Sequence, residues 1–337
     1  MSVLLDEYRH TRDGMRYGFA VGKVRVLATR LLDRSALERL VDAPSYAEQK
    51  RILSETPYGR FLEHANTAAD VDEALDRSLD SVYAFLAEAG LPEAVQRFFR
   101  VRFDYTNLKG ALKADALGVT VDDLLVDHGT VPREAFRGPL SKLPERYSAL
   151  AREIEQGLDE ADGETSLMAI DVAIDRALYA ELREIAVAAR SRFLQDLAAR
   201  LSDVANLKSI VRARNAGLTA AAMTEMIVDG GSMSSRDLAA LYRLPHQDML
   251  AGLERRLGLK GSPLVDAHGM SDLDVIVDNV IVETIRRAKR AEPGPEDVIA
   301  YVRARESEVQ VLRVALLGKM AGLDSETLHR RMRASFL

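Results

Sequence analysis

Polar residues that could do chemistry stand close together in "DYTNLKGALKADALGV", residues 104 to 119. Asp104, Asn107 and Lys109 could belong to a catalytic site, since carboxylate, amide and amine groups are among those that enzymes use. They could equally be residues that pack one helix against another. The surrounding Leu and Ala residues indicate a helix, so the rest of the sequence must distinguish the two interpretations.

Other candidate sites are weak. The six histidines are too widely spaced for a metal motif, and H-E-x-x-H is absent. The acidic stretch 266–279 places Asp272, Asp274 and Asp278 near His268, which could bind a hard cation. Acids in the first turn of a helix are the more frequent explanation of such a stretch.

Phosphate-binding and nucleophile motifs are also incomplete. "LLGKM" at 316–320 has no Gly five residues before Gly318 and no Ser or Thr after Lys319, which excludes a P-loop. "DGGS" at 229–232 could cradle a phosphate, but a turn is the better interpretation because the third spaced Gly of a dinucleotide site is absent. No Ser stands in a nucleophile elbow. We therefore predict no catalytic, cofactor-binding or metal-binding residues.

The composition predicts an all-α protein. Of 337 residues, 47% are hydrophobic and 29% charged, aromatic residues make up 6%, and Pro is limited to 10. Ala, Leu, Arg and Glu dominate, and these residues favour helices over strands. The absence of Cys excludes disulfides and thiolate chemistry and suits a reducing compartment.

Charge and hydropathy limit the partners. The net charge of -6 argues against a nucleic-acid-binding surface, and the basic runs at 286–290 and 329–333 are more typical of solvated helix ends. No stretch approaches the roughly 18 apolar residues of a membrane-spanning helix, and no export signal is evident. We expect no transmembrane segment of its own and, at a membrane, a peripheral location.

The opening stretch occurs three times. "DYTNLKGALKADALGV" at 104, "DVANLKSIVRARNAGL" at 203 and "EVQVLRVALLGKMAGL" at 308 each begin with an acid and have Gly as the next-to-last residue. Their Leu positions are 99 and 105 residues apart. The other aligned positions are Asn107, Asn206 and Val311, then Leu108, Leu207 and Leu312, then Lys109, Lys208 and Arg313.

Two further short sequence motifs occur upstream, in the same order in each repeat. An Asp stands 31, 31 and 33 residues before the Asn or Val position, and an L-x-x-x-P word precedes each Asp. These acids are Asp76, Asp175 and Asp278. The repeat predicts three subdomains, residues 1–118, 119–217 and 218–337. Each would contain a short helix broken near its Pro, a long helix that starts at the Asp, and a second helix that ends at the Gly.

Apolar residues recur at helical spacing in the second helix of each subdomain. This stripe predicts a helix buried along one side, and the Gly suits a C-terminal cap that needs positive φ. The stripe consists of Phe98, Tyr105, Leu108 and Leu112, then Leu197, Val204, Leu207 and Val211, then Val302, Val309, Leu312 and Leu316.

The repeat favours a structural role for the polar residues. Catalytic Asn107 and Lys109 would require several copies of one active site, the third altered by Val311. We instead expect Asn107 and Asn206 to hydrogen-bond backbone groups where helices meet, because an unpaired buried polar group costs about 1 to 3 kcal/mol. We also expect the repeated acids and bases to pair within each subdomain, as Asp76 with Lys109, Asp175 with Lys208 and Asp278 with Arg313.

Similar sequence motifs occur in a known protein family. "YGFAVGKVRVLATRLLDRSALERLVDAPSYAEQKRILSETPYG", residues 17 to 59, followed by "DYTNLKGALKADALG" and "DVANLKSIVRARNAG", resembles the C-type subunit of bacterial and archaeal V/A-type rotary ATPases, the counterpart of the eukaryotic d-type subunit. The resemblance extends from Tyr17 through essentially the whole chain. Val311 and Arg313 depart from the expected Asn and Lys, and residues 1–16 match nothing in the pattern.

That resemblance implies an all-helical funnel of three similar subdomains around a pseudo-threefold axis. In the family, this non-catalytic subunit sits on the cytoplasmic face of the membrane, on the proteolipid ring. It receives the central stalk, with its D-type and F-type subunits, and so couples ATP synthesis or hydrolysis to H⁺ or Na⁺ transport without a cofactor. The alternatives are an α-helical repeat scaffold that binds protein partners and, last, an enzyme on a helical scaffold.

Overall fold

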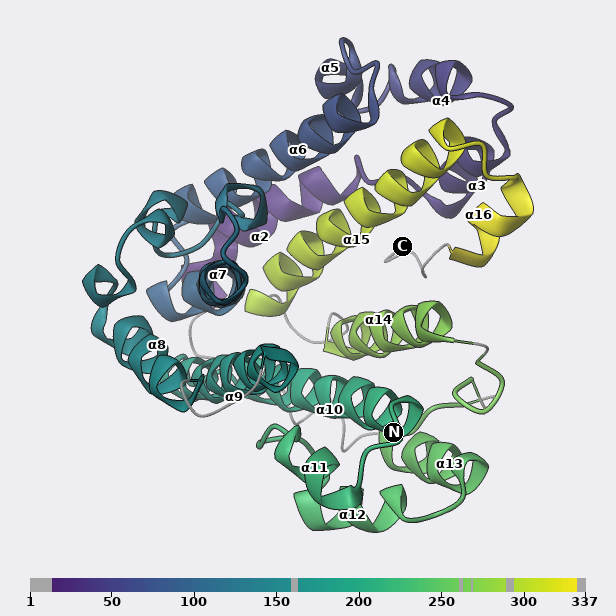
Figure 1. The fold of residues 1–337 in the computed structure, drawn as a ribbon. Helices are drawn as coiled ribbons and strands as arrows, with labels where there is room; N and C mark the ends of the chain where they lie inside the picture. Colours follow the sequence, from purple (N-terminus) through teal and green to yellow (C-terminus); the bar gives the residue numbers. More distant parts are fainter. Residues whose placement is uncertain (1–13, 159–162, 261–262, 268, 289–293, 332–337) are drawn as a thin grey trace. The chain divides into compact units, whose positions relative to one another are not determined.

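A computed structural model describes residues 14–158, 163–260, 263–267, 269–288 and 294–331, and every regular element in these ranges is a helix (Figure 1). The all-α prediction is confirmed. The chain divides into two compact units: one combines residues up to Leu91 with those from Asp266 onward, and the other comprises Pro92–Val265. The three subdomains and their funnel arrangement stay predictions.

The first unit is built around one long helix, α15 (Pro295–Met320). Helices α2 (Gly14–Ala28), α6 (Ala68–Glu88) and α14 (Met270–Ala288) pack against it. Short helices also contact α15 or α6; they are α3 (Arg34–Asp42), α4 (Tyr46–Leu53), α5 (Gly59–Leu62) and α16 (Ser325–Arg331).

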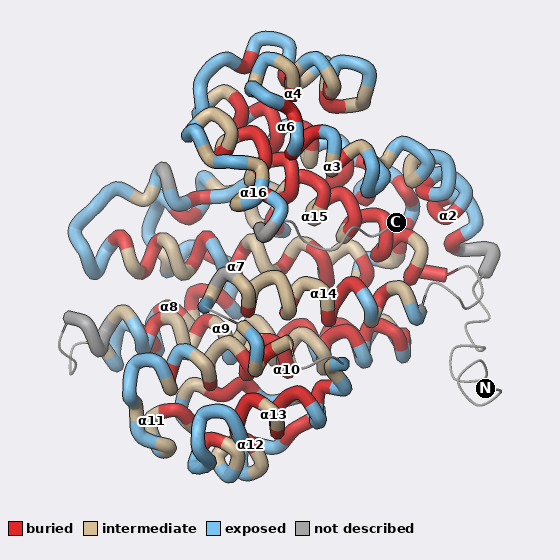
Figure 2. Tube along the Cα trace, turned by 90° about the vertical axis from the view of Figure 1, so that its right-hand side faces the viewer, coloured by how far each residue is buried: buried red, intermediate tan, exposed pale blue. Residues whose placement is uncertain are grey.

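The core of the first unit joins residues that are distant in the sequence. Tyr58 and Leu75, from the N-terminal part, are fully buried in one cluster with Leu312 and Leu316 of α15. Figure 2 shows this as buried segments of α6 and α15 beneath exposed outer turns. Because apolar burial is the main favourable term in folding, neither part of the chain can complete this core alone.

The second unit is a row of long helices with short ones on its surface. Helix α7 (Glu93–Leu117) packs along α9 (Gly163–Ala188), and α9 packs along α10 (Arg192–Asn215). The shorter elements are the 3-10 turns η1 (Asp122–Leu124), η2 (Arg133–Arg137) and η3 (Leu140–Lys142), and helices α8 (Glu145–Leu158), α11 (Ala220–Glu225), α12 (Ser235–Tyr242) and α13 (His246–Leu257).

The repeated stretch lies in α7, α10 and α15, here called the repeat helices. They end where the sequence predicts, because Gly118, Gly217 and Gly322 have φ of 64°, 67° and 80°. Eleven of the twelve stripe residues are buried, and Val211 is half-buried. No helix of the described residues is both long and apolar enough to cross a membrane.

One prediction about the long helices is wrong. Asp76, Asp175 and Asp278 lie inside α6, α9 and α14 rather than at their first residues. In α6 the start is set earlier, by a capping box in which Thr67 accepts a hydrogen bond from the N–H of Asp70 and the Asp70 carboxylate accepts one from that of Thr67. The predicted start missed this local signal.

Candidate functional site

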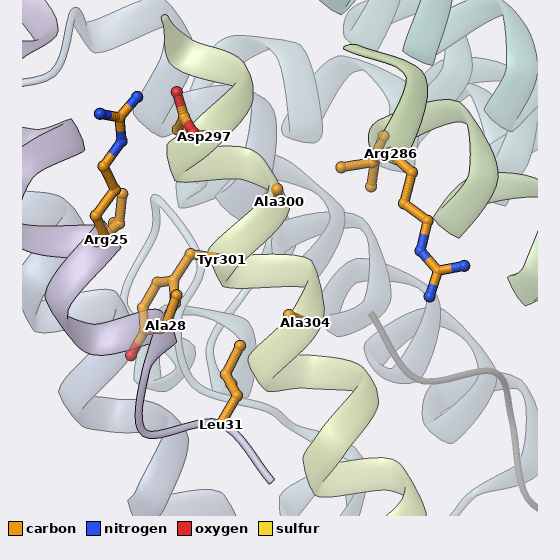
Figure 3. Close-up of a pocket in the computed structure, with 10 residues that line it drawn as sticks. Arg25, Ala28, Leu31, Arg286, Asp297, Ala300, Tyr301 and Ala304 are labelled. Atoms are coloured by element: carbon orange, nitrogen blue, oxygen red, sulfur yellow. The ribbon is translucent and has the colours of Figure 1, made fainter. Parts of the chain in front are cut away.

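A pocket in the first unit, between α2, α14 and α15, is lined mostly by apolar side chains. Arg25, Arg286 and Asp297 are the charged residues around it, and Figure 3 shows Arg25 and Arg286 on opposite sides. Tyr301 and small or aliphatic side chains line the rest. None of its described lining residues is a Ser, Thr, His or Cys that could act as a nucleophile.

Asp104, on α7, is fully buried and holds the loop that follows the helix. Its carboxylate accepts hydrogen bonds from the backbone N–H groups of Thr130, at 3.1 Å, and Val131, at 2.9 Å. The hydroxyls of Thr130 and Tyr147 donate to it as well. A carboxylate that accepts this many hydrogen bonds from its own chain positions that chain and has little capacity left to accept a hydrogen bond from a substrate.

Asn107 lies one turn further along α7 and holds the same loop by its amide. Its Nδ2–H donates to the backbone oxygen of Val126 at 2.9 Å, and its Oδ1 accepts from the N–H of Val126 at 2.7 Å. Both amide groups therefore bond backbone, which satisfies a fully buried polar side chain.

The second repeat helix, α10, contains the same arrangement. Asp203 accepts from the N–H of Ser232 at 2.6 Å and from its hydroxyl at 2.8 Å. The Asn206 amide donates to the backbone oxygen of Val228 at 2.9 Å and accepts from its N–H at 2.8 Å. We call an anchor the buried acid at the first position of the repeated stretch together with the loop that it holds and, in α7 and α10, the Asn that holds the same loop.

Each of these two anchors is accompanied by a short loop motif, which the interpretation of the sequence missed. V-D-x-G-[ST] occurs at 126–130 and at 228–232, and its Val and Thr or Ser are the residues that the Asn and Asp hold. A Cβ at Gly129 or Gly231 would lie under 3.0 Å from the carboxylate of the anchor Asp. "DGGS" forms a bent loop, and Gly231 is needed for the close approach of loop and acid.

The third repeat helix, α15, holds its loop differently. Glu308 accepts from the Tyr58 hydroxyl at 2.5 Å and forms an ion pair with Arg305 at 2.6 Å. It also accepts from the backbone N–H of Leu32. Val311 stands at the Asn position and is buried. Burial raises the pKa of the Glu308 carboxyl above its usual range, although the guanidinium of Arg305 opposes that shift.

The predicted pairing of repeated charges within each subdomain is wrong for Lys109 and Arg313. Lys109 Nζ lies 2.7 Å from Asp175 and 3.3 Å from Asp171, both on α9. The physical reason is that α7 packs along α9, so its basic residue faces the acids of the next repeat.

Arg313 shows the same pattern in the first unit. Its guanidinium lies 2.6 Å from Asp76 and 2.5 Å from Asp72, because α15 packs along α6. The basic side chains of α7 and α15 therefore pair with the acidic helix of a different repeat. These pairs are partly exposed, and each is expected to contribute little to stability.

The other candidates do not converge. Among the described residues no group of three His, Asp or Glu side chains could hold a metal ion. Asp272, Asp274 and Asp278 lie along α14, and His268 lies outside the described residues. Leu108, Leu207 and Leu312 are fully buried, as the apolar stripe predicts.

Comparisons with known proteins place most of the chain in one family. The family model "ATP synthase (C/AC39) subunit" matches residues 20–331. The C-type subunit of the V-type ATP synthase of Thermus thermophilus is 27% identical over 90% of this chain and 94% of its own. The C-type subunit of the A-type ATP synthase of Methanocaldococcus jannaschii is 22% identical over 93% of this chain and 85% of its own.

A third relative is named as a subunit of a sodium ATPase. The C-type subunit of the V-type sodium ATPase of Enterococcus hirae is 22% identical over 92% of this chain and 96% of its own. The matches cover both compact units and all three repeat helices. The chain therefore belongs to the ATP synthase (C/AC39) subunit family, the C-type subunits of the V/A-type ATPases.

Proposed function

We propose that this chain is a non-catalytic rotor subunit that seats on the proteolipid ring and receives the central stalk, so that torque passes between the ring and the catalytic head. The observation that carries the proposal is the family match over residues 20–331. Its place would be the cytoplasmic face of the membrane, as a peripheral part of the complex.

The internal anchors support this role on physical grounds. A part that transmits torque must resist deformation, and packed helices with low internal void volume are stiff. The anchors fix each loop to its repeat helix through a buried carboxylate, and in α7 and α10 also through an amide. The polar residues that first suggested catalysis thus serve rigidity, which a coupling subunit needs and an enzyme on this scaffold would not explain.

The decisive experiment compares ATP hydrolysis with ion movement. Complexes with and without this chain would be reconstituted into vesicles, and ATP turnover and ion uptake measured together. Loss of the chain should leave hydrolysis by the soluble head and abolish ion uptake. Retained ion uptake would overturn the rotor proposal and favour the repeat-scaffold alternative, whereas loss of hydrolysis with the head still assembled would favour an enzyme.

A point variant tests the rigidity argument in the intact complex. Asp104→Asn weakens the α7 anchor, and we expect fewer ions moved per ATP at an unchanged rate of hydrolysis. Asp115→Asn is the matched control, because Asp115 is an exposed acid of the same helix. Equal coupling ratios for the two variants would show that the anchor does not serve coupling.

A further inference from the structure

Helix α2 of the first unit presents an exposed face that is both apolar and basic. Phe19 is 68% exposed and Val26 is 60% exposed, and their spacing of seven residues places them on the same side of the helix. Lys23 is exposed and lies between them, with Nζ 6.0 Å from the centroid of the Phe19 ring and 5.0 Å from that of Phe85 on α6. The sequence contains no Asp or Glu from Gly14 to Leu32, so no acid of this segment offsets that charge.

Two glycines within the same helix are unexplained by the packing of the unit. A Cβ added to Gly18 or Gly22 would meet nothing within 4 Å. Glycine inside a helix lowers its stability relative to alanine, so an exposed pair is unfavourable unless their small size is used. Glycines four residues apart lie on one side of a helix, where they let the backbone of a second helix approach closely.

We propose that Gly18, Phe19, Gly22, Lys23 and Val26 form a docking surface for an α-helix of another subunit that carries acidic side chains. Phe19 and Val26 would be apolar anchors spaced as in helix-in-groove recognition. The two glycines would admit the partner backbone, and Lys23 would pair with an acid. This assignment rests on the proposed function, which places the chain in a multisubunit complex.

The alternative occupants fit fewer of these features. A membrane surface with anionic lipids would explain the exposed Phe19 and the basic charge, as in interfacial helices. Lipid headgroups, however, gain nothing from paired glycines. A second molecule of this chain would bring another basic α2 face against the first, and like charges oppose such pairing.

The first test separates folding from docking. Gly22→Leu should leave the melting temperature of the isolated chain unchanged or raise it, because the new side chain meets nothing. In complexes solubilised from membranes, the same variant should lower retention of the chain by at least about tenfold. Gly157→Leu is the matched control, since Gly157 is an exposed helical glycine of α8 with nothing within 4 Å. Equal retention of the two variants would overturn the proposal.

The second test identifies the occupant. A chain with p-benzoylphenylalanine in place of Val26 would be crosslinked in the assembled complex, and the joined peptide sequenced. Support requires a helical peptide of another subunit with an acid within one turn of the crosslink, and a yield that Lys23→Glu lowers but the exposed-site control Arg236→Glu does not. Crosslinks only to lipid, or to a second molecule of this chain, would contradict the proposal.

Vesicle sedimentation gives an independent readout of the lipid alternative. The full chain would be mixed with phosphatidylcholine vesicles, with or without phosphatidylglycerol. Binding to the anionic vesicles that Phe19→Ser abolishes would overturn the helix assignment. A chain that stays in its complex regardless of these α2 variants would refute this inference and leave the proposed function standing, since that function is tested separately, by ATP hydrolysis and ion uptake after loss of the whole chain.

Discussion

The anchors of α7 and α10 differ from that of α15 in what faces the buried acid. Asp104 and Asp203 accept hydrogen bonds from neutral backbone and hydroxyl donors of a loop that follows in the chain. Asp203 also lies 3.7 Å from the guanidinium of Arg200, which is partly exposed. Glu308 is balanced by a buried guanidinium, and its loop contact, Leu32, comes from the opposite end of the chain. The difference teaches that the acid at this position can hold a loop either with or without a buried guanidinium of its own helix beside it, and the two arrangements should fail differently.

The largest effect should come from removing the acid of the α15 anchor. Glu308→Ala leaves Arg305, which is 6% exposed, without its partner, and a broken buried ion pair costs about 3 to 5 kcal/mol. Asp203→Ala leaves the neutral donors of Ser232 unpaired and removes a long contact, 3.7 Å, with the partly exposed Arg200, which is expected to contribute little. About 1 to 3 kcal/mol is therefore expected. Urea unfolding measures both, and hydrogen exchange assigns each loss to its unit.

A double variant checks the charge argument. If the uncompensated guanidinium causes the loss, Arg305→Met combined with Glu308→Met should be more stable than Glu308→Ala alone. Equal costs for Glu308→Ala and Asp203→Ala would remove the distinction between the two kinds of anchor.

In the α7 and α10 anchors, a loop glycine lies so close to the buried Asp that one added methyl group should disrupt the contact. A Cβ at Gly231 would lie 2.5 Å from an Asp203 carboxylate oxygen, and Gly129 is equally restricted by Asp104. Overpacking of this kind costs about 1 to 3 kcal/mol, so Gly231→Ala and Gly129→Ala should each lower the free energy of unfolding. Gly157→Ala, which meets nothing, should not. A neutral result at both loop glycines would show that the acids do not need this approach.

The backbone hydrogen bonds of Asn107 and Asn206 should differ in how much they contribute to stability, because the two sites differ in solvent exposure. Val228 is 3% exposed and Val126 is 37% exposed, so the backbone freed at Val126 can bond water. Asn206→Ala should therefore cost about 1 to 3 kcal/mol, as for buried groups left unpaired, and Asn107→Ala less. Thermal denaturation of the two variants side by side is the measurement. A larger loss of stability for Asn107→Ala than for Asn206→Ala would mean that solvent exposure does not determine the contribution of these hydrogen bonds.

The smallest effect concerns the charge pairs between repeats. Lys109 is 27% exposed and Asp175 is 45% exposed, and such pairs contribute about 0.2 to 1 kcal/mol. A double-mutant cycle with Lys109→Met and Asp175→Asn should give a coupling energy in this range. The same cycle with Asp76→Asn should give none, since the partner of Asp76 is Arg313. Coupling of Lys109 to Asp76 would restore the pairing that the sequence suggests.

Local features of the fold were predictable because they depend on residues near each other in the chain. The apolar stripe of Leu108 and its equivalents follows from helical periodicity, and the ends at Gly118, Gly217 and Gly322 follow from the φ that glycine allows. The family resemblance rested on the same local words, and the comparisons confirm it.

The pairing of charges was not predictable in the same way. The aligned repeats show that a basic residue recurs at the position of Lys109 and an acid at that of Asp175. The partner of each depends on which helices pack together, and hydrophobic periodicity does not contain that information. Nor does any local pattern bring Tyr58 and Glu308 together, since 250 residues separate them. The V-D-x-G-[ST] word could have been found by extending the repeat search downstream of Gly118 and Gly217.

The contact between Leu32 and Glu308 has a consequence for the order of synthesis. The ribosome completes α3 to α6 long before it begins α15, which supplies Leu312 and Leu316 to their core. At roughly 5 to 20 residues per second, the first unit waits on the order of 10 to 50 seconds with its apolar side chains uncovered. The second unit, continuous in the chain, can fold meanwhile. We therefore expect the N-terminal part to bind a chaperone during translation.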